Sequence, residues 1–446
     1  MHIQFFGASG MVTGSNYLLS DDGGYGILVD MGMFQGSAEL EELNNKPIEF
    51  DAREVHSVFL THGHLDHAGR MPILLKHGFS GKIYLTAATR EIAEIVLLDA
   101  AKIMQKDKEK PILYTEADVF DLLNHAEIVS YGEEVDLGNM IATFRDAGHI
   151  LGSASIEMEF TKEGKKLAFS GDLGNSPEDL VKPTEFIESA DIVVMESTYG
   201  DRQHPKDNPS AEIQKEINFV EGSGGVLLIP SFSVERTQAI LHIISHLKGN
   251  GKVRKETPVF MDSPMGERVT KVYKEFPNLY NPELAEDLKS GDPFSFPGIH
   301  NIDNFKASKE IHEMGGTKVI IAGSGMMTGG RILEHAKNYL PSKDTRLLIV
   351  GFQAEGTIGR QLEEGATSVN IEGIEVKVAA TVNSLHSMSS HADQTNLLKW
   401  LSHIKGAEKV FLVHGEDGPR EVLKEEIKKG GIKQVYLPHL SEYSEI

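Results

Sequence analysis

The residues with the clearest chemical potential lie in one short stretch, Thr61–Gly69, which reads Thr-His-Gly-His-Leu-Asp-His-Ala-Gly. Three histidines and an aspartate follow directly after an apolar run at residues 58–60. Imidazole and carboxylate are the ligand types that bind zinc-class cations at neutral pH. His62 and His64 alternate onto one side of an extended segment, whereas Asp66 and His67 follow at the start of a helix. The stretch therefore predicts a metal site with two ligand sets.

Further ligand-type side chains follow hydrophobic runs elsewhere in the chain: Asp30, His149, Asp172 and His414. Each comes at the carboxyl end of an apolar run and close to a glycine, which allows the backbone to approach closely. Taken singly, an aspartate before glycine is a common turn, and a histidine at the end of a strand is often only hydrogen-bonded. Taken with the first stretch, these residues predict a larger metal centre.

Composition sets the limits within which such a site must be built. A chain of 446 residues is too long for one ordinary core, so we expect two or three domains. With 40% hydrophobic and 25% charged residues, it is typical of a soluble globular protein. We find no signal peptide and no apolar run near the roughly 18 residues of a membrane span, so we expect a cytoplasmic protein without a membrane partner. The absence of cysteine excludes disulfides and thiolate-ligated zinc.

The net charge of −22 argues against a non-specific coat on nucleic acid. The charge is unevenly distributed, because residues 205–370 hold 19 basic and 21 acidic residues. Almost all of the excess acid therefore lies outside this segment, and bound metal ions would offset part of it. A polyanionic substrate is compatible with this charge if it enters beside the near-neutral segment.

The pattern of elements predicts an interrupted first domain. In the first 204 residues, short strands with glycine-rich turns and a few helices indicate packed sheets covered by helices. From residue 205, apolar strands alternate with amphipathic helices, which predicts a parallel, doubly wound α/β domain. The strand-rich pattern returns after residue 370. We therefore expect a first part at 1–204, an inserted domain at 205–370 and a completing part at 371–446.

Individual elements are expected at the following places. We expect strands at 3–7, 15–19, 25–30, 55–60, 82–86, 140–146, 153–160, 166–171, 191–196, 225–230, 258–261, 318–322, 346–351, 374–382 and 409–413. We expect helices at 67–77, 87–104, 115–123, 210–221, 235–247, 265–275, 305–314, 330–339, 391–404 and 418–428. The candidate ligands then lie where strands end, on the loops that usually carry chemistry.

As an ensemble these motifs resemble the metallo-β-lactamase superfamily and its β-CASP branch of nucleic-acid-processing nucleases. The superfamily motifs correspond to Asp30, His62-x-His64-x-Asp66-His67, His149 and Asp172, and the branch motifs to residues 196–200, 389–393 and 413–416. Two glycine-rich stretches, 323–331 and 351–360, are also similar to family signatures. The resemblance covers essentially the whole chain. It implies a metallo-β-lactamase αββα sandwich with an inserted doubly wound parallel α/β (β-CASP) domain.

The resemblance also implies two zinc ions, with manganese as an alternative metal. Carried over residue by residue, it gives the first ion to His62, His64 and His149, the second to Asp66, His67 and His414, and the bridging role to Asp172. Asp30 would orient a ligand histidine through a hydrogen bond.

For the reaction, we expect zinc-dependent hydrolysis of RNA phosphodiester bonds, endonucleolytic in mode. A bridging hydroxide between the two metals, oriented by Asp66, would attack the phosphorus. His391, held protonated by Glu196, is the candidate general acid for the leaving 3′-oxygen. Attack by water leaves 5′-phosphate and 3′-hydroxyl ends. A role for His386 is left open.

Substrate binding is assigned to the second domain. The stretch Gly323–Arg331 follows an apolar strand and opens a helix, and backbone N–H groups at a helix N-terminus bind anions. We expect single-stranded RNA in the cleft between the two domains, contacted by Ser324, Gly325, Arg331, Arg360 and Ser390.

Several alternatives stay open from the sequence. A small-molecule metallo-hydrolase on the same scaffold is disfavoured by the inserted domain and by His391 and His414. A 5′-exoribonuclease or a DNA nuclease of the same family is compatible with the motifs, because contacts to the ribose 2′-hydroxyl have no sequence signature. A non-catalytic scaffold is disfavoured because the chain keeps every ligand. A homodimer is also left open.

Overall fold

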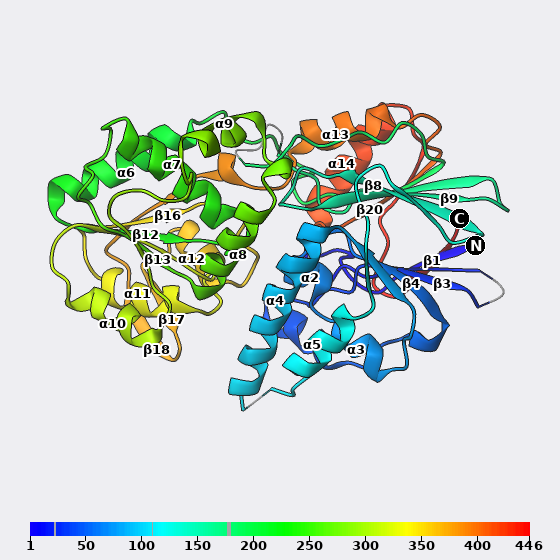
Figure 1. Ribbon diagram of the computed structural model, residues 1–446, viewed down its shortest axis with the longest axis horizontal. Helices are drawn as coiled ribbons and strands as arrows, with labels where there is room; N and C mark the ends of the chain where they lie inside the picture. Colours follow the sequence, from blue (N-terminus) through cyan, green and yellow to red (C-terminus); the bar gives the residue numbers. More distant parts are fainter. Residues whose placement is uncertain (22–23, 109, 176–179) are drawn as a thin grey trace. The chain divides into compact units, whose positions relative to one another are not determined.

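The computed structural model describes residues 1–21, 24–108, 110–175 and 180–446. The chain divides into two compact units (Figure 1). Unit 1 combines Met1–Gln203 with His391–Ile446, and unit 2 is the continuous segment His204–Ser390. The chain thus leaves unit 1, builds unit 2 and returns to complete unit 1, which is the arrangement expected of an inserted domain.

Unit 1 is built on two mixed sheets. The first sheet runs in the order β22 (Glu442–Glu445), β1 (His2–Phe5), β2 (Tyr17–Ser20), β3 (Gly26–Val29), β4 (Val55–Phe59), β5 (Lys82–Leu85) and β6 (Ala126–Ile128). The second runs in the order β21 (Gln434–Tyr436), β20 (Lys409–Val413), β11 (Ile192–Glu196), β10 (Lys165–Phe169), β9 (Ala154–Phe160), β8 (Met140–Asp146) and β7 (Glu134–Asp136). In each sheet, antiparallel pairing on one side gives way to parallel pairing on the other.

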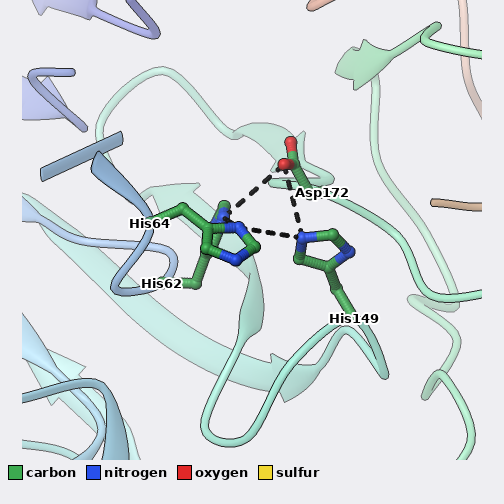
Figure 2. Close-up of side chains that lie close together, drawn as sticks. All are labelled: His62, His64, His149 and Asp172. Carbon is green, nitrogen blue, oxygen red and sulfur yellow. Dashed lines mark hydrogen bonds and ion pairs between the residues drawn. The ribbon is translucent and has the colours of Figure 1, made fainter. Parts of the chain in front are cut away.

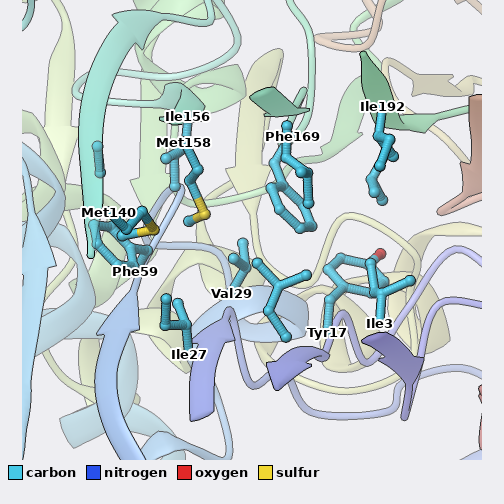
Figure 3. Packing of buried hydrophobic residues seen from close by; sticks show 14 of the residues in the cluster. Ile3, Tyr17, Ile27, Val29, Phe59, Met140, Ile156, Met158, Phe169 and Ile192 are labelled. Atoms are coloured by element: carbon cyan, nitrogen blue, oxygen red, sulfur yellow. The ribbon is translucent and has the colours of Figure 1, made fainter. Parts of the chain in front are cut away.

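The core of unit 1 lies between these two sheets. Side chains from the first sheet, among them Ile27, Val29 and Phe59, pack against Met140 and Ile156 from the second (Figure 3). Burial alternates strictly along β8, as it does in a strand with one face on the core. Burying this apolar surface is the main force that holds the sheets together.

Helices cover the outer face of each sheet in unit 1 (Figure 1). The first sheet is covered by α2 (Leu65–Ala68), α3 (Met71–Lys76), α4 (Ala87–Lys106) and α5 (Glu116–Leu123), and the second by α13 (Gln394–His403) and α14 (Asp417–Lys429). Short turns of helix lie at α1 (Ala38–Glu42), η1 (Leu43–Asn45) and η2 (Ala52–Glu54). The layers therefore follow the order helix, sheet, sheet, helix, which confirms the expected αββα sandwich.

Unit 2 is an α/β domain around a parallel sheet. Its strands run in the order β14 (Ile299–Asn301), β13 (Val259–Asp262), β15 (Lys318–Ala322), β12 (Val226–Pro230), β16 (Thr345–Ile349) and β19 (Thr381–Ser384), and every neighbouring pair is parallel. Its helices are α6 (Pro209–Ser223), α7 (Arg236–Gly249), α8 (Pro264–Glu275), α9 (Pro282–Ser290), α10 (Phe305–Glu313), α11 (Arg331–Tyr339) and α12 (Ile358–Glu363). Single turns η3 (Pro277–Leu279) and η4 (His386–Met388) and a hairpin, β17 (Ser368–Ile371) with β18 (Ile374–Lys377), complete the unit.

Two predicted elements are divided in the structure. The helix expected at 67–77 is two short helices, α2 and α3, because Pro72 has no N–H to donate and instead occupies the first turn of α3. The strand expected at 374–382 is two strands in different sheets. Its first half, β18, turns back on β17 through Glu372 and Gly373, which both have positive φ, while β19 joins the parallel sheet beside β16.

The end of the inserted unit also differs from the expected boundary at residue 370. Because β19 pairs with β16, the segment that follows the hairpin belongs to unit 2, which extends to Ser390. The expected completing part at 371–446 is correspondingly shorter and begins at His391. Among the described residues, no helix is long and apolar enough to cross a membrane.

The topology of unit 1 brings chemistry-bearing residues to the same ends of its sheets. Asp172, Glu196 and His414 lie at or just after the carboxyl ends of β10, β11 and β20, which are parallel neighbours. Asp30 and His62 follow β3 and β4, which are also parallel neighbours. Parallel strands end at the same edge of a sheet, so residues far apart in the sequence become neighbours in space.

Candidate metal centre

The first ligand set consists of three histidines and one carboxylate on loops that follow three different strands (Figure 2). His64 Nδ1 lies 3.0 Å from His62 Nε2 and 3.2 Å from His149 Nε2. Asp172 Oδ2 lies 3.5 Å from His62 Nε2 and 3.6 Å from His149 Nε2. Three ring nitrogens and an oxygen therefore converge on one point, as tetrahedral coordination of a zinc-class cation requires.

The second ligand set lies beside the first and consists of Asp66, His67 and His414. Asp66 Oδ2 lies 3.3 Å from His414 Nε2 and 4.0 Å from His67 Nε2. Asp66 and His67 belong to α2, as the sequence predicted, while His414 follows β20. The structure thus brings together all the residues that the resemblance assigns to the second ion.

Asp172 connects the two sets. Its Oδ2 atom faces the first set, while its Oδ1 atom lies 3.3 Å from His67 Nε2 and 3.7 Å from His414 Nδ1. Oδ1 is fully buried and, within the described part of the chain, accepts no hydrogen bond. A buried carboxylate oxygen without a hydrogen bond is costly unless a cation binds it. This atom and the converging imidazoles fit a pair of divalent cations bridged by Asp172.

A relay of hydrogen bonds orients the ligand histidines. Asp30 Oδ2 lies 2.8 Å from His67 Nδ1, so this nitrogen donates to the carboxylate and Nε2 is left facing the second set. The Thr61 hydroxyl donates to Asp30 Oδ2 over 2.8 Å and accepts from His62 Nδ1 over 3.0 Å. On the other side, the Thr198 hydroxyl lies 3.1 Å from His414 Nδ1. Such contacts fix the tautomer and direction of ligand rings.

The protonation of the site also favours cations. Burial lowers the pKa of His62 well below its usual value and the pKa of His64 to about 4, so both rings are neutral and free to act as ligands. For His67, burial opposes protonation, but Asp172 and Asp30 raise its pKa well above the usual value. A proton on His67 therefore compensates the buried carboxylates where a bound metal ion would otherwise do so.

A histidine and a glutamate lie beside the ligand sets. His391 Nδ1 lies 3.2 Å from Glu196 Oε2 and 3.9 Å from Asp172 Oδ2. Glu196 is completely buried and also accepts a hydrogen bond from the Leu173 N–H over 2.6 Å. Burial opposes protonation of His391, but Glu196 and Asp172 raise its pKa to about 9. The imidazole is therefore cationic at neutral pH and can donate a proton.

The residues predicted to bind substrate lie in unit 2, and they differ in how their polar groups are used. The Ser324 hydroxyl is engaged inside its own loop, where it accepts from the Thr328 and Gly329 N–H groups. At Gly325 an added Cβ would lie 2.5 Å from the Phe232 ring, so only glycine fits there. Gly325 is buried beside this ring, and the predicted contacts of Ser324 and Gly325 to substrate stay predictions.

The three remaining predicted contacts already have partners in the protein. Arg331 pairs with Asp262 and donates to the carbonyl oxygens of Ile302 and Asp303. Arg360 Nε donates to Glu364 over 2.6 Å. Ser390 accepts a 2.7 Å hydrogen bond from the buried Arg236. A role for these side chains in binding phosphate stays a prediction, since Arg331 in particular anchors its own helix.

Some functional candidates were not predicted from the sequence. His386, which the sequence left open, is half exposed and lies 3.8 Å from Glu363 in unit 2. Thr198 and Arg236 were not predicted at all, although Thr198 orients His414 and Arg236 holds Ser390. Their positions give little local signal, because Thr198 lies just after the buried strand β11 and Arg236 begins α7, and many structural residues share such positions.

Comparisons with known proteins agree with this geometry. Residues 10–215 match the metallo-beta-lactamase superfamily, residues 237–362 the Beta-Casp domain, and residues 375–438 the Zn-dependent metallo-hydrolase RNA specificity domain. The fold and the histidine-rich site thus define a metallo-hydrolase of the metallo-β-lactamase superfamily. Within that superfamily, the chain belongs to the β-CASP family.

Individual relatives are similar over most of the chain. The sequence is 40% identical over 419 residues to Ribonuclease TTHA0252 of Thermus thermophilus, with 94% of both chains covered. It is 30% identical over 396 residues to an RNase J-like protein of Methanocaldococcus jannaschii, with 87% of both chains covered. Transcription termination factor FttA of Pyrococcus abyssi is 31% identical over 425 residues, and this chain covers 64% of its length.

One solved structure shares the fold at low sequence identity. A crystal structure of a protein of unknown function from Enterococcus faecalis V583 aligns with a TM-score of 0.54 and 12% identity over 99% of both chains. This likeness concerns the fold alone.

Proposed function

We propose that this protein is a metal-dependent endoribonuclease that hydrolyses single-stranded RNA and leaves 5′-phosphate and 3′-hydroxyl ends. The observation that carries the proposal is the convergence of two ligand sets and the His391–Glu196 pair on Asp172. The choice of RNA is supported by the 40% identity to a protein named a ribonuclease and by the match to an RNA specificity domain.

The proposed ligands divide between two cations, zinc in the first instance and manganese as the alternative. The first would be held by His62, His64 and His149, the second by Asp66, His67 and His414, and Asp172 would bind both. When bound, two such ions lower the pKa of water and neutralise charge on a phosphodiester.

The chain itself supplies a proton and an orienting carboxylate. His391 Nδ1 is held by Glu196, so the proton available for the leaving 3′-oxygen is the one on Nε2. Asp66 is 19% exposed, in contrast to the almost fully buried Asp172 and Asp30. It is therefore the carboxylate that can orient a water molecule arriving from solvent, which is the role proposed for it here.

The substrate contacts proposed in unit 2 use backbone as well as side chains. The loop from Ser324 to Gly330 precedes α11, whose N-terminus carries a partial positive charge that favours phosphate. The N–H groups of Ile332 and Leu333 already donate to the carbonyl oxygens of Gly323 and Gly330. Arg331, Arg360 and Ser390 are proposed to add side-chain contacts. A cytoplasmic location and a homodimer stay predictions from the sequence.

The decisive test uses purified, metal-analysed protein and a single-stranded RNA carrying a label at its 3′ end. We expect internal fragments that a 5′-phosphate-requiring ligase can join to another RNA. A matched DNA strand, a chelator and the Asp66→Ala/His67→Ala variant serve as controls, and none should give fragments.

Other outcomes contradict specific parts of the proposal. Release of mononucleotides from the 5′ end would replace the endonucleolytic mode with an exonucleolytic one. Equal cleavage of DNA would remove RNA specificity. Intact RNA in the presence of protein carrying two metal ions per chain would overturn the assignment as a ribonuclease.

A further inference from the structure

A second group of ligand-type side chains lies in unit 2, on helices that carry no residue of the centre described above. His242 and His246 lie one turn apart on α7, and Asp287 lies on α9. Residues four apart on a helix share one face, so both imidazoles can reach the same partner. Asp287 Oδ2 lies 2.7 Å from Nε2 of His242 and 2.7 Å from Nε2 of His246.

The exposure of these side chains suits a cation that enters from solvent. The His242 side chain is 6% exposed, whereas those of His246 and Asp287 are 38% and 31% exposed. One ligand is thus fixed by packing and two border on water. The three ligand atoms all lie within 4.8 Å of one another. A cation at their centre would keep an open position for water, as zinc sites with fewer than four protein ligands do.

Without a cation, the two Nε2–H groups donate to the same carboxylate oxygen. Asp287 Oδ2 thus already faces both ring nitrogens. A cation uses the same three atoms once each imidazole carries its proton on Nδ1 and turns the lone pair of Nε2 inward. The change requires a tautomeric shift and a small widening of the group, and the backbone can stay in place.

We propose that His242, His246 and Asp287 form a third metal site, which binds one divalent cation of the zinc, nickel or cobalt class. Two imidazoles and one carboxylate suit these borderline cations better than magnesium or calcium, which prefer oxygen ligands.

The site would tether α9 to α7. In α9, Leu284 is the buried residue, so the helix has little apolar surface to hold it in place. A cation shared by the two helices cross-links them in the native state and not in the unfolded chain. Zinc would therefore stabilise unit 2 separately from its role in the catalytic centre.

The test counts metal in the full chain. Metal-free protein is equilibrated with buffered zinc, and the zinc content per chain is measured for the wild type and for the His246→Ala and Asp287→Asn variants. His300→Ala, which alters an exposed histidine of the same unit, is the matched control. We expect the wild type and the control to carry one zinc more than the two variants. Affinity at this site should fall at least about 100-fold in the variants, since even partners of ligands contribute 10–100-fold.

Two further measurements make the result independent of folding and of the catalytic centre. Asp287→Asn keeps the size of the side chain, so it tests the site even where His246→Ala perturbs α7. Zinc should raise the unfolding temperature of Asp66→Ala/His67→Ala protein, and adding His246→Ala should reduce that rise. Equal zinc content in the wild type, the control and both variants would overturn the proposal and show a hydrogen-bonded cluster only. It would leave the ribonuclease proposal unaffected, because that proposal is tested by RNA cleavage and rests on the ligands of unit 1.

Discussion

Residues that are hydrogen-bonded to the ligand histidines of unit 1 determine which ring nitrogen of each histidine can bind a metal ion. His67 has two ring nitrogens, and the hydrogen bond from Nδ1 to Asp30 directs Nε2 toward Asp172. The Thr61 hydroxyl is hydrogen-bonded both to this carboxylate and to the ring of His62. One hydroxyl therefore helps to orient residues of both ligand sets.

Asp30→Asn tests this relay. The amide keeps the shape of the carboxylate but loses its charge, so it holds His67 Nδ1–H more weakly. We expect affinity for the second metal ion to fall about 10–100-fold, while the first ion stays bound. The zinc content of the protein, measured over a range of free zinc concentrations, reports the binding of the first ion and of the second. Asp51→Asn, in an exposed pair with Arg53, is the control that should bind as the wild type does. If the second ion bound to Asp30→Asn protein as tightly as to the wild type, Asp30 would have only a structural role.

Glu196→Gln tests the origin of the proton on His391. Because Glu196 helps to raise the pKa of His391 to about 9, the imidazole keeps its proton below that pH and loses it above. The cleavage rate should therefore fall as pH rises through the pKa of His391. Removing the negative charge of Glu196 lowers this pKa, so the alkaline limb of kcat/KM should move to lower pH in the variant.

The readout is a pH profile of kcat/KM with metal saturating in both proteins. His391→Ala is the companion variant. Its pH profile should lack the alkaline limb, and its cleavage rate should be about 10²–10⁴-fold lower than that of the wild type. If the limb stayed at the same pH in Glu196→Gln protein, His391 would not be the group that titrates.

At this scale, the structure brings the predicted ligands together, and of their hydrogen-bond partners the sequence predicted Asp30 but not Thr198. Histidine and aspartate after apolar runs are conspicuous because few other functions need them there. Thr198 carries no such signal, because a threonine hydroxyl takes its role from whichever ring the fold places beside it. For Arg331, an arginine after glycines predicts a contact to phosphate, and the fold also pairs it with Asp262, which the sequence did not predict.

At the scale of elements, close backbone contacts hold the ligand loops in register. Gly32, in the loop after β3, lies so close to α2 that an added Cβ would be 1.6 Å from the Asp66 carbonyl oxygen. On either side of this glycine, Met31 donates to the carbonyl oxygen of His67 and Met33 to that of Leu65. The start of α2 is therefore placed by the loop beside it, through contacts that the sequence of α2 alone does not contain.

Gly32→Ala should displace the segment that carries Asp66 and His67. Backbone cannot yield as a flexible side chain does, so we expect the free energy of unfolding to fall by about 1–3 kcal/mol. The second metal ion should also bind more weakly. Chemical denaturation and zinc content measure the two effects.

Gly418→Ala is the matched control, because an added Cβ at this position in α14 has open space around it. It should leave stability unchanged or raise it slightly, since alanine favours helix more than glycine does. A Gly32→Ala protein as stable as this control would show that the loop can rearrange freely.

The elements themselves were predictable to the extent that their burial is periodic. The strand expected at 140–146 is the observed β8, whose alternating pattern one buried face imposes. The short helix α9, in which Leu284 is the buried residue, was not predicted. The divided strand at 374–382 was missed because both halves favour β structure, and only pairing decides which sheet each joins.

At the scale of the whole molecule, each unit has its own hydrophobic core and its own group of candidate metal ligands. Unit 1 holds clusters between and outside its two sheets, and unit 2 holds a separate cluster on its parallel sheet. Two cores of this kind need not unfold in one step. The single tryptophan, Trp400, is buried in unit 1, so its fluorescence reports on that unit alone.

Chelation should therefore separate the two units in a thermal scan. Cations that bind only the native state stabilise it by about 4 kcal/mol at a thousandfold excess over Kd. Removing them from His246→Ala protein should lower the midpoint of the Trp400 transition. A second transition, seen by circular dichroism, should not move. Coincident transitions that shift together would show that the units unfold as one.

The interrupted course of unit 1 has a consequence for biosynthesis. His414 belongs to the second ligand set, β20 lies within the second sheet, and β22 is the edge strand of the first. All three are translated after the whole of unit 2. A nascent chain can fold its inserted unit early, but it cannot assemble the second ion site until translation has passed His414. A chain still on the ribosome before His414 therefore lacks one residue of the candidate metal centre, even when its inserted unit has already folded.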